Sequence, residues 1–358
     1  MTSEFNGGML RIARQFRGLH QKELAELAGV DAAILSRAEN NALVPSDHVL
    51  DKCAKQLAVP RQFFFEQFHP TGLPLSFHHM WRKRQSVAQR DVDRVLAHAN
   101  IRAFHLRRLL QSVVIEPTLP LPQFEPGEYG NDCREIAKLV RRSWAAPAGP
   151  LLNLTSYVER AGIFVAHVDL EKVDVDGLTV RMPGLPPCIL LNRFLPADRM
   201  RFTLAHELAH VVMHRVPSSE MEKQANDFAS ALLLPSDDLR PYLIGRKIDL
   251  KLLAQLKPQW RVSMASLLMA SRELDLLGPG QEQRLWKIFS AKKYRMREPT
   301  ELDFAVEQTT LDRRLIDAHL KELDYSLEEL GELLVFEVAD ICEVYQIPTP
   351  RRGLRVVS

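Results

Sequence analysis

The feature that most constrains this chain is the segment HELAH, residues 206–210, which is followed twelve residues later by Glu222. On a helix, positions i and i+4 lie on one face, so the imidazoles of His206 and His210 can reach one metal ion. Glu207 lies between them and is angled towards a water bound to that metal. These residue types at this spacing predict the zinc site of a metallopeptidase.

A catalytic zinc needs three protein ligands and one open position, so the two histidines need a third partner. The candidates are His214, Glu220 and Glu222. His214 follows His206 by eight residues, about 12 Å along the helix that we expect over 196–214, and this distance excludes it. A second helix is expected from about Glu220, where that residue faces solvent, whereas Glu222 falls on the apolar stripe. We therefore expect Glu222 to be the third ligand.

Asn226 lies one turn after Glu222, and its side-chain carbonyl could accept the N–H of a ligating histidine. The alternative interpretation is that HExxH marks only the solvated face of an amphipathic helix. The following helix, with the small residues Ala225 and Ala229, favours the metal site. Mn²⁺ or Fe²⁺ would fit the same ligands as Zn²⁺. His214 and Tyr157 are the nearby titratable candidates for stabilising the transition state.

Residues 201–210 (RFTLAHELAH) and 222–235 (EKQANDFASALLLP) resemble the ImmA/IrrE family of gluzincin-like metallopeptidases. Residues 186–192 (PPCILLN) match the strand that this family carries just upstream, so the resemblance covers about the middle third of the chain. It implies a zincin-like α+β fold in which His206, His210 and Glu222 hold the metal and Glu207 is the base. It also implies a protein substrate, typically a transcriptional repressor.

Residues 9–66 show the spacing of a helix-turn-helix bundle, with helices expected over 9–19, 21–28, 32–40 and 46–59. Gly29 supplies the turn, and Asp31 can cap the third helix. The segment resembles the XRE family of DNA-binding domains. That resemblance implies that the third helix enters the major groove of duplex DNA and that Gln21 touches the DNA backbone. Asp31, Ser36 and Arg37 are then the expected base contacts.

The charge of the N-terminal part does not by itself indicate DNA binding. Residues 1–70 hold eight Lys and Arg against eight Asp and Glu, so no net positive charge is available to release counterions. The alternative for this bundle is dimerisation or partner binding, and a homodimer stays open. Residues 71–115 hold eight basic and two acidic residues, a net charge of +6. We interpret them as the solvated face of a long helix over 81–114 rather than as phosphate contacts.

The remaining chain completes a multidomain, mainly α organisation. A proline-rich hinge over 115–130 precedes an α+β region with strands expected over 163–170, 177–182 and 188–192. Residues 328–345 echo residues 22–39, which suggests a degenerate second helix-turn-helix. Being acidic, it favours partner docking or dimerisation over DNA, although core packing explains its apolar stripe equally well. The expected domains are 1–70 (helix-turn-helix), 71–130 (basic connector and hinge), 131–278 (metallopeptidase) and 279–358 (C-terminal helices).

Composition excludes several classes of protein. The hydrophobic content of 46% suits globular cores, and the four cysteines form no CxxC pair, so neither a disulfide framework nor a cysteine zinc site is expected. The first residues lack a secretory pattern and no run of eighteen apolar residues occurs, so we expect a cytoplasmic protein without membrane contact.

Two functions compete on this sequence. One is a DNA-binding regulator whose zinc peptidase cleaves a repressor or another regulatory protein in a stress, prophage or toxin–antitoxin setting. The other is a non-proteolytic transcription factor, or an antitoxin-like partner, whose metallopeptidase-like domain is a sensor. A pure sensor could keep the ligands and lose the base, so the presence of Glu207 favours the enzyme.

Overall fold

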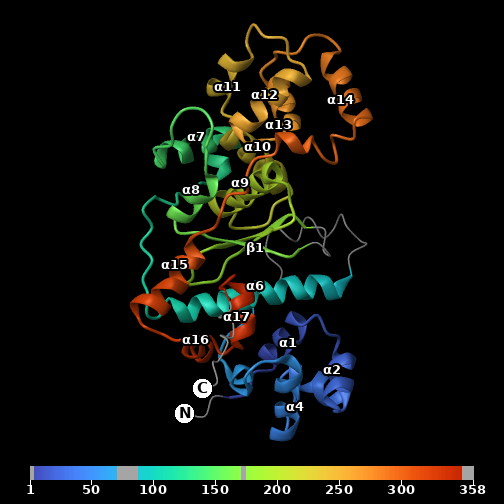
Figure 1. Cartoon of the computed structure of the whole chain (residues 1–358), viewed down its shortest axis with the longest axis vertical. Helices are drawn as coiled ribbons and strands as arrows, with labels where there is room; N and C mark the ends of the chain where they lie inside the picture. Colours follow the sequence, from blue (N-terminus) through green and yellow to red (C-terminus); the bar gives the residue numbers. More distant parts are fainter. Residues whose placement is uncertain (1–3, 71–87, 171–174, 349–358) are drawn as a thin grey trace, which may run out of the picture.

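The computed structural model describes residues 4–70, 88–170 and 175–348, and it is mostly helical with a small sheet in its middle region (Figure 1). The N-terminal helices are α1 (Gly7–Phe16), α2 (Gln21–Ala28), α3 (Ala32–Glu39) and α4 (Asp47–Leu57), followed by the 3₁₀ helix η1 (Arg61–Phe65). Gly29 ends α2 in the left-handed region at φ 59°, and the Asp31 side chain accepts the Ala33 N–H at 2.7 Å. The predicted helix-turn-helix spacing is confirmed.

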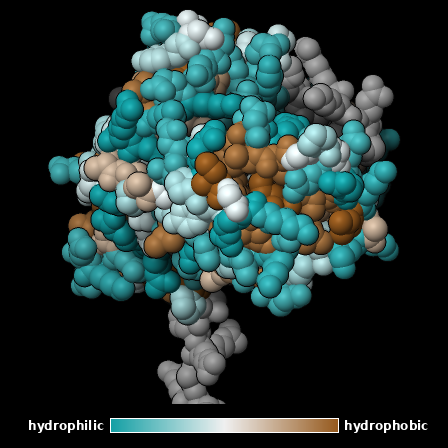
Figure 2. Space-filling model, turned by 90° about the horizontal axis from the view of Figure 1, so that it is seen from above, coloured by the Kyte–Doolittle hydropathy of each residue, from teal (hydrophilic) through white to brown (hydrophobic). Residues whose placement is uncertain are grey.

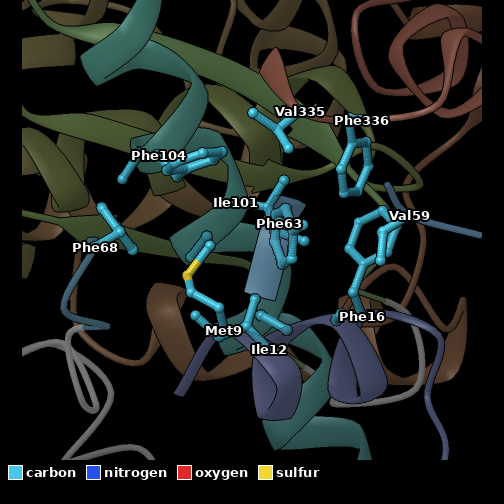
Figure 3. Close-up of a cluster of buried hydrophobic side chains, with 14 of the residues drawn as sticks. Met9, Ile12, Phe16, Val59, Phe63, Phe68, Ile101, Phe104, Val335 and Phe336 are labelled. Carbon is cyan, nitrogen blue, oxygen red and sulfur yellow. The ribbon is translucent and has the colours of Figure 1, made fainter. Parts of the chain in front are cut away.

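Helix α6 (Gln89–Leu109) crosses the molecule between the N-terminal helices and the sheet (Figure 1). It corresponds to the long helix expected over 81–114, of which residues 81–87 lie outside the described part of the chain. Figure 3 shows how Phe104 of α6 lies near Phe63, with Phe16 and Phe336 completing the cluster. The ring centroids of Phe63 are 5.7 Å from Phe104 and 5.8 Å from Phe336. Segments from both ends of the chain therefore share one apolar core.

The sheet consists of β1 (Phe164–Val168), β2 (Gly177–Val180) and β3 (Cys188–Asn192) in the order β1-β3-β2. Strand β1 pairs with β3 in parallel, and β2 pairs with β3 antiparallel, with Thr179 opposite Ile189. Successive side chains of a strand point to opposite faces. Accordingly, Ala166 and Leu190 face the core shared with α6, whereas Val165 and Ile189 face a second core.

That second core is built from helices of the middle of the chain. They are α7 (Cys133–Ser143), α8 (Leu154–Arg160), α9 (Ala197–Met213), α10 (Met221–Leu233), α11 (Ser236–Leu243), α12 (Leu250–Trp260) and α13 (Met264–Glu273). Helix α14 (Gln281–Ala291) joins the same core through buried Leu285 and Phe289. The C-terminal helices expected from residue 279 are thus divided, because the first of them packs with the middle region.

The later C-terminal elements are η4 (Thr300–Leu302), α15 (Leu311–Asp317), η5 (Ala318–Glu322), α16 (Leu327–Leu334) and α17 (Val338–Val344). Their apolar faces pack inside the chain, with Leu315 of α15 and Leu334 of α16 buried in the core that contains α6. Val335 ends α16 in the left-handed region at φ 52°, as Gly29 ends α2. Helices α16 and α17 begin eleven residues apart, like α2 and α3, so the expected echo exists in the backbone.

The segment interpreted as a hinge is bonded to the middle region over much of its length. Thr118 and Leu119 both donate their backbone N–H groups to the Arg160 carbonyl, and Phe124 donates to the Val212 carbonyl at 3.0 Å. The Trp144 indole donates to the Pro120 carbonyl, also at 3.0 Å. The 3₁₀ helix η2 (Pro126–Tyr129) ends this segment. A swing about residues 117–124 would break these bonds.

Among the described residues, no helix is both long enough and apolar enough to cross a membrane.

Candidate metal centre and helix-turn-helix face

Helices α9 and α10 form the framework of the candidate metal centre. Small residues at their contact, Ala209 on α9 with Ala225 and Ala229 on α10, are all fully buried and let the two backbones approach closely. His210 lies one turn after His206 on α9, and Glu222 lies in the first turn of α10. The close packing therefore brings three residues that the sequence predicts as ligands to one place.

The three side chains have the separations that a tetrahedral metal ion requires. The two Nε2 atoms of His206 and His210 are 3.1 Å apart. Glu222 lies 3.5 Å from His206 Nε2 through Oε2 and 3.6 Å from His210 Nε2 through Oε1. Two ligand atoms that each lie about 2.0–2.1 Å from a tetrahedral zinc are about 3.3 Å from one another. All three observed edges are close to that value, so the residues present fit the ion.

Electrostatics at this position favour a cation. The buried Oε1 of Glu222 has no hydrogen-bond partner among the described residues, and an unsatisfied buried carboxylate oxygen is costly. Burial acts to lower the pKa of His206, but the hydrogen bond that His206 donates to Glu222 and the charges of Glu207 and Glu222 outweigh it, so this pKa is raised. A site that stabilises a charged imidazole also stabilises a metal cation.

Each candidate ligand histidine is oriented through its other ring nitrogen. His206 Nδ1 lies 3.0 Å from the Asn226 side-chain oxygen, the contact expected from the sequence. An amide oxygen only accepts, so His206 Nδ1 carries a hydrogen, and in the neutral ring Nε2 has the lone pair that can bind a metal beside Glu222. This contact fixes which nitrogen can bind a metal.

The orientation of His210 comes from residues whose role the sequence analysis missed. His210 Nδ1 lies 2.8 Å from His214 Nδ1, and His214 Nε2 lies 3.0 Å from the Gln224 side-chain oxygen. Burial lowers the pKa of His214, so this ring is neutral and has a single N–H, which it donates to Gln224. His214 Nδ1 must then accept from His210 Nδ1–H, which leaves the His210 Nε2 lone pair facing Glu222. The signal was the spacing of four between His210 and His214.

Glu207 is buried and is held by a residue of β2, one of the two edge strands of the sheet. The Thr179 hydroxyl donates to Glu207 Oε2 at 2.7 Å and contacts the Glu207 carbonyl oxygen at 3.3 Å. Thr179 can reach α9 because its neighbours Leu178 and Val180 point into the other core, on the opposite face of β2. A buried carboxylate on α9, directly after His206 and three residues before His210, is in the position expected of a proton-transferring group.

The N-terminal bundle presents one face of α3 to solvent. Asp31, Ala33 and Arg37 are exposed, whereas Leu35 and Ala38 are buried and Ser36 is partly buried. Asp31 also caps α3, so its carboxylate is engaged with the backbone of its own helix. Of the four residues that the sequence predicts to contact DNA, Arg37 is the exposed one that carries positive charge.

Gln21 makes an internal contact. Its side-chain amide donates to Glu39 Oε2 at 2.8 Å. Glu39 is buried and also accepts two hydrogen bonds from the Arg14 guanidinium, at 2.6 and 2.8 Å. Removing one partner of a buried ion pair is strongly destabilising, so this network fixes α1, α2 and α3 to one another. Gln21 therefore has a structural contact in addition to the DNA contact expected of it.

Two parts of the chain match models of known protein families. Residues 158–271 match the peptidase-family model described as IrrE N-terminal-like domain, and residues 10–64 match the model described as helix-turn-helix. The chain joins a helix-turn-helix to an IrrE-like domain. The fusion suggested by the sequence is thereby confirmed. No curated protein matches the chain.

The surroundings of three further residues, in or next to the IrrE-like match, distinguish the roles that the sequence left open. Glu220 is exposed at the start of α10, as expected. His214 lies behind His210, on the side away from the His210 Nε2 atom, so it is not placed to stabilise a transition state at the metal. Tyr157 stacks on Trp144 with an interplanar angle of 18° and lies beneath the Arg160 guanidinium. These contacts describe a packing role for Tyr157.

Helix α6 lies between the two matched regions, and several of its arginines bond to other segments of the chain. Arg102 pairs with Asp312 of α15, and Arg108 pairs with Glu66 at 2.7 Å. Arg90 donates to the Gly18 carbonyl. Arg82, Lys83 and Arg84, which contribute to the net charge of the connector, lie outside the described residues. The described part of the connector thus ties the helix-turn-helix and the C-terminal helices together.

The contacts of His214 give a first prediction. Replacing His214 by Ala, or Gln224 by Leu, is expected to weaken zinc binding by about 10- to 100-fold, because His210 then loses the partner that fixes its tautomer. Competition with a chromophoric chelator measures the dissociation constant. Gln281→Leu, a matched change on α14, should leave zinc binding unchanged. Unaltered zinc affinity in both His214→Ala and Gln224→Leu would show that the contact does not orient His210.

Proposed function

We propose that the chain is a DNA-binding transcriptional regulator whose IrrE-like domain is a zinc-dependent peptidase. The observation that carries this proposal is the convergence of His206, His210 and Glu222 at tetrahedral separations beside the buried carboxylate of Glu207. The substrate we propose is a regulatory protein, in particular a transcriptional repressor, in a stress, prophage or toxin–antitoxin setting. This substrate class rests on the likeness to the ImmA/IrrE family.

The residues divide the proposed chemistry between them. His206 Nε2, His210 Nε2 and Glu222 would hold the ion; zinc is typical of this peptidase family, although Mn²⁺ or Fe²⁺ suits the same donors. When bound, zinc would act as a Lewis acid and lower the pKa of water. Glu207 takes a proton from the attacking water and returns it to the amine that leaves. Thr179 keeps the Glu207 carboxylate in position for both transfers.

For the helix-turn-helix, we propose that α3 lies in the major groove of duplex DNA. The family match supports this placement, and the exposed face with Arg37 supplies a cation at the protein surface. Asp31, Ser36 and Gln21 remain proposed contacts beside it. With eight basic and eight acidic residues in 1–70, the domain lacks a large electrostatic contribution, so we expect moderate affinity with a shallow dependence on salt.

Replacing Arg37 by Ala tests that placement. Specific DNA binding is expected to weaken by about 10- to 100-fold, because a side chain that reads a base edge contributes about 1–3 kcal/mol. Binding is measured by fluorescence anisotropy against an operator selected from random duplexes. The matched control is Lys55→Ala, an exposed cation on α4. Equal loss in both variants, or no salt-dependent binding by the native chain, would contradict the proposed DNA face.

The experiment that tests the whole proposal compares the proteomes of cells that carry the native chain or Glu207→Gln. A regulatory protein that is shortened only with the native chain is the expected result, and it would identify the substrate. Both chains should bind DNA equally, because Glu207 lies on the far side of the sheet from the helix-turn-helix. If no protein is cleaved under any condition that activates the regulator, the peptidase assignment is wrong and a sensor role takes its place.

A further inference from the structure

A polar cavity of about 160 Å³ lies at the junction of four segments that are far apart in the sequence. Helix α6, strand β1, the first turn of α15 and the end of α17 all contribute to its lining, and Figure 1 shows α15 and α17 beside α6. Its described lining residues include none of the candidate metal ligands. The cavity is therefore separate from the candidate metal centre.

An ion pair between Arg102 of α6 and Asp312 of α15 borders this cavity. The Arg102 side chain is only 11% exposed. Its guanidinium also donates to the Val344 carbonyl at 2.7 Å and lies over the Tyr345 ring, 5.4 Å from the ring centroid. The bonds to Asp312 and Val344 use two of the five N–H donors that a guanidinium offers. Arg102 is thus a cation held in one position, which spares a ligand the cost of ordering it.

His167 of β1 brings an unsatisfied polar atom to the same cavity. Its Nε2 atom is buried and has no hydrogen-bond partner among the described residues. Burial, with a smaller contribution from the charge of Arg102, lowers the pKa of His167, so the ring is neutral and carries one N–H. Leaving a buried imidazole nitrogen without a partner is costly, so the cavity favours an occupant that bonds to it.

The volume of the cavity limits the size of that occupant. A single water takes up about 30 Å³, so one water does not fill the space. A cavity of about 150 Å³ is large enough to bind benzene. A single molecule that fills this cavity therefore has on the order of six to ten non-hydrogen atoms.

The lining carries more positive than negative charge. Arg102 and Arg313 can only donate, whereas Asp312 is the one carboxylate among the described lining residues. Arg313 also bonds to Asp317 at 3.0 Å, but that pair lies at the surface, where such pairs contribute little, so Arg313 can turn to a ligand. A guanidinium matches the two oxygens of a carboxylate. Figure 2 shows an apolar area at the other end of the molecule, where α11 and α14 lie, so this junction is chemically distinct from it.

We infer that this cavity binds a small organic carboxylate, whose oxygens accept hydrogen bonds from Arg102 and from the Nε2–H of His167. Arg313 would add its charge at the surface. Such a ligand would contact α6, which packs beneath the helix-turn-helix, together with β1 of the sheet and the C-terminal helices. The inference makes the chain a receptor for a small metabolite-like anion, and it does not depend on peptidase activity.

Isothermal titration calorimetry on the full chain tests the inference with succinate, L-glutamate and benzoate as probes. At least one of them is expected to bind with a dissociation constant below about 1 mM, which is ordinary for a small charged ligand. The amide of that probe, which keeps the shape and loses the charge, should bind at least about tenfold more weakly, because hydrogen bonds to a charged acceptor are the stronger ones. Inorganic phosphate, which is too small to fill the cavity, should also bind more weakly.

Two variants assign the binding to this cavity. His167→Phe removes the unsatisfied nitrogen, and Arg313→Gln removes an exposed charge that the fold does not need; each is expected to weaken binding of the carboxylate by at least about fivefold. Arg142→Gln, an exposed arginine of α7, is the matched control and should bind as the native chain does. If His167→Phe does not fold, Arg313→Gln decides. No binding of any probe, equal binding of the amide or of phosphate, or native affinity in the folded variants would overturn the inference.

Discussion

Glu207→Gln is expected to lower the rate of peptide-bond cleavage by about 10²- to 10⁴-fold while the chain keeps one zinc ion. Glutamine has nearly the shape of glutamate and can still accept the Thr179 hydroxyl, but it cannot take a proton from water. Cleavage is measured on the substrate found in the proteome comparison, with zinc content determined on the same sample by elemental analysis.

Two further variants make this result specific. Glu220→Gln changes an exposed carboxylate at the start of α10 and should leave the rate unchanged. Thr179→Val should lower the rate less than Glu207→Gln does, because it loosens the base without removing it. A Glu207→Gln chain that retains zinc and cleaves within tenfold of the native rate would show that another residue is the base.

Removal of a ligand is expected to have the other large effect. His206→Ala, His210→Ala or Glu222→Ala should each leave less than about a tenth of an equivalent of zinc after dialysis, against one equivalent for the native chain, because a two-ligand site binds far more weakly than a three-ligand site. Elemental analysis decides the outcome. Circular dichroism should show the helical content unchanged.

The control for ligand removal comes from the same turn of α10. Glu220→Ala should retain a full equivalent of zinc, since its side chain is exposed. Full stoichiometric zinc in Glu222→Ala would mean that the third ligand is another residue, and Glu220 would then be tested next in combination with Glu222. Loss in both variants would point to damage to α10 rather than to a missing ligand.

Local spacing explains what could be predicted from this sequence. The i and i+4 positions of His206 and His210, and the turn at Gly29 between α2 and α3, depend only on residues close together in the chain. Their helices were therefore predictable, as were the three strands. Asn226 was found by the same reasoning, since it lies one turn from Glu222.

Contacts between distant segments explain what the sequence did not reveal. Thr179 meets Glu207 because the alternation along β2 turns this hydroxyl towards α9, while Leu178 and Val180 face the other core. Arg102 meets Asp312 across 210 residues of chain. A residue in α6 cannot be recognised as internal until its partner is known, and a net charge of +6 read along the sequence does not show it. Buried Lys257 likewise meets Glu298 across 41 residues of chain.

The position of Phe336 affects the order in which the core beneath the helix-turn-helix can pack during synthesis. Its ring lies 5.4 Å from Phe16 and 5.8 Å from Phe63, so a residue near the end of the described chain completes the core beneath the helix-turn-helix (Figure 3). Synthesis proceeds from the N-terminus, and the N-terminal parts of a chain ordinarily fold first. Here α1 to α4 are synthesised before the IrrE-like match and Phe336, so their packing against the Phe336 ring is completed only after that middle region has been made. A product that ends before Phe336 would therefore lack part of the apolar core beneath its helix-turn-helix.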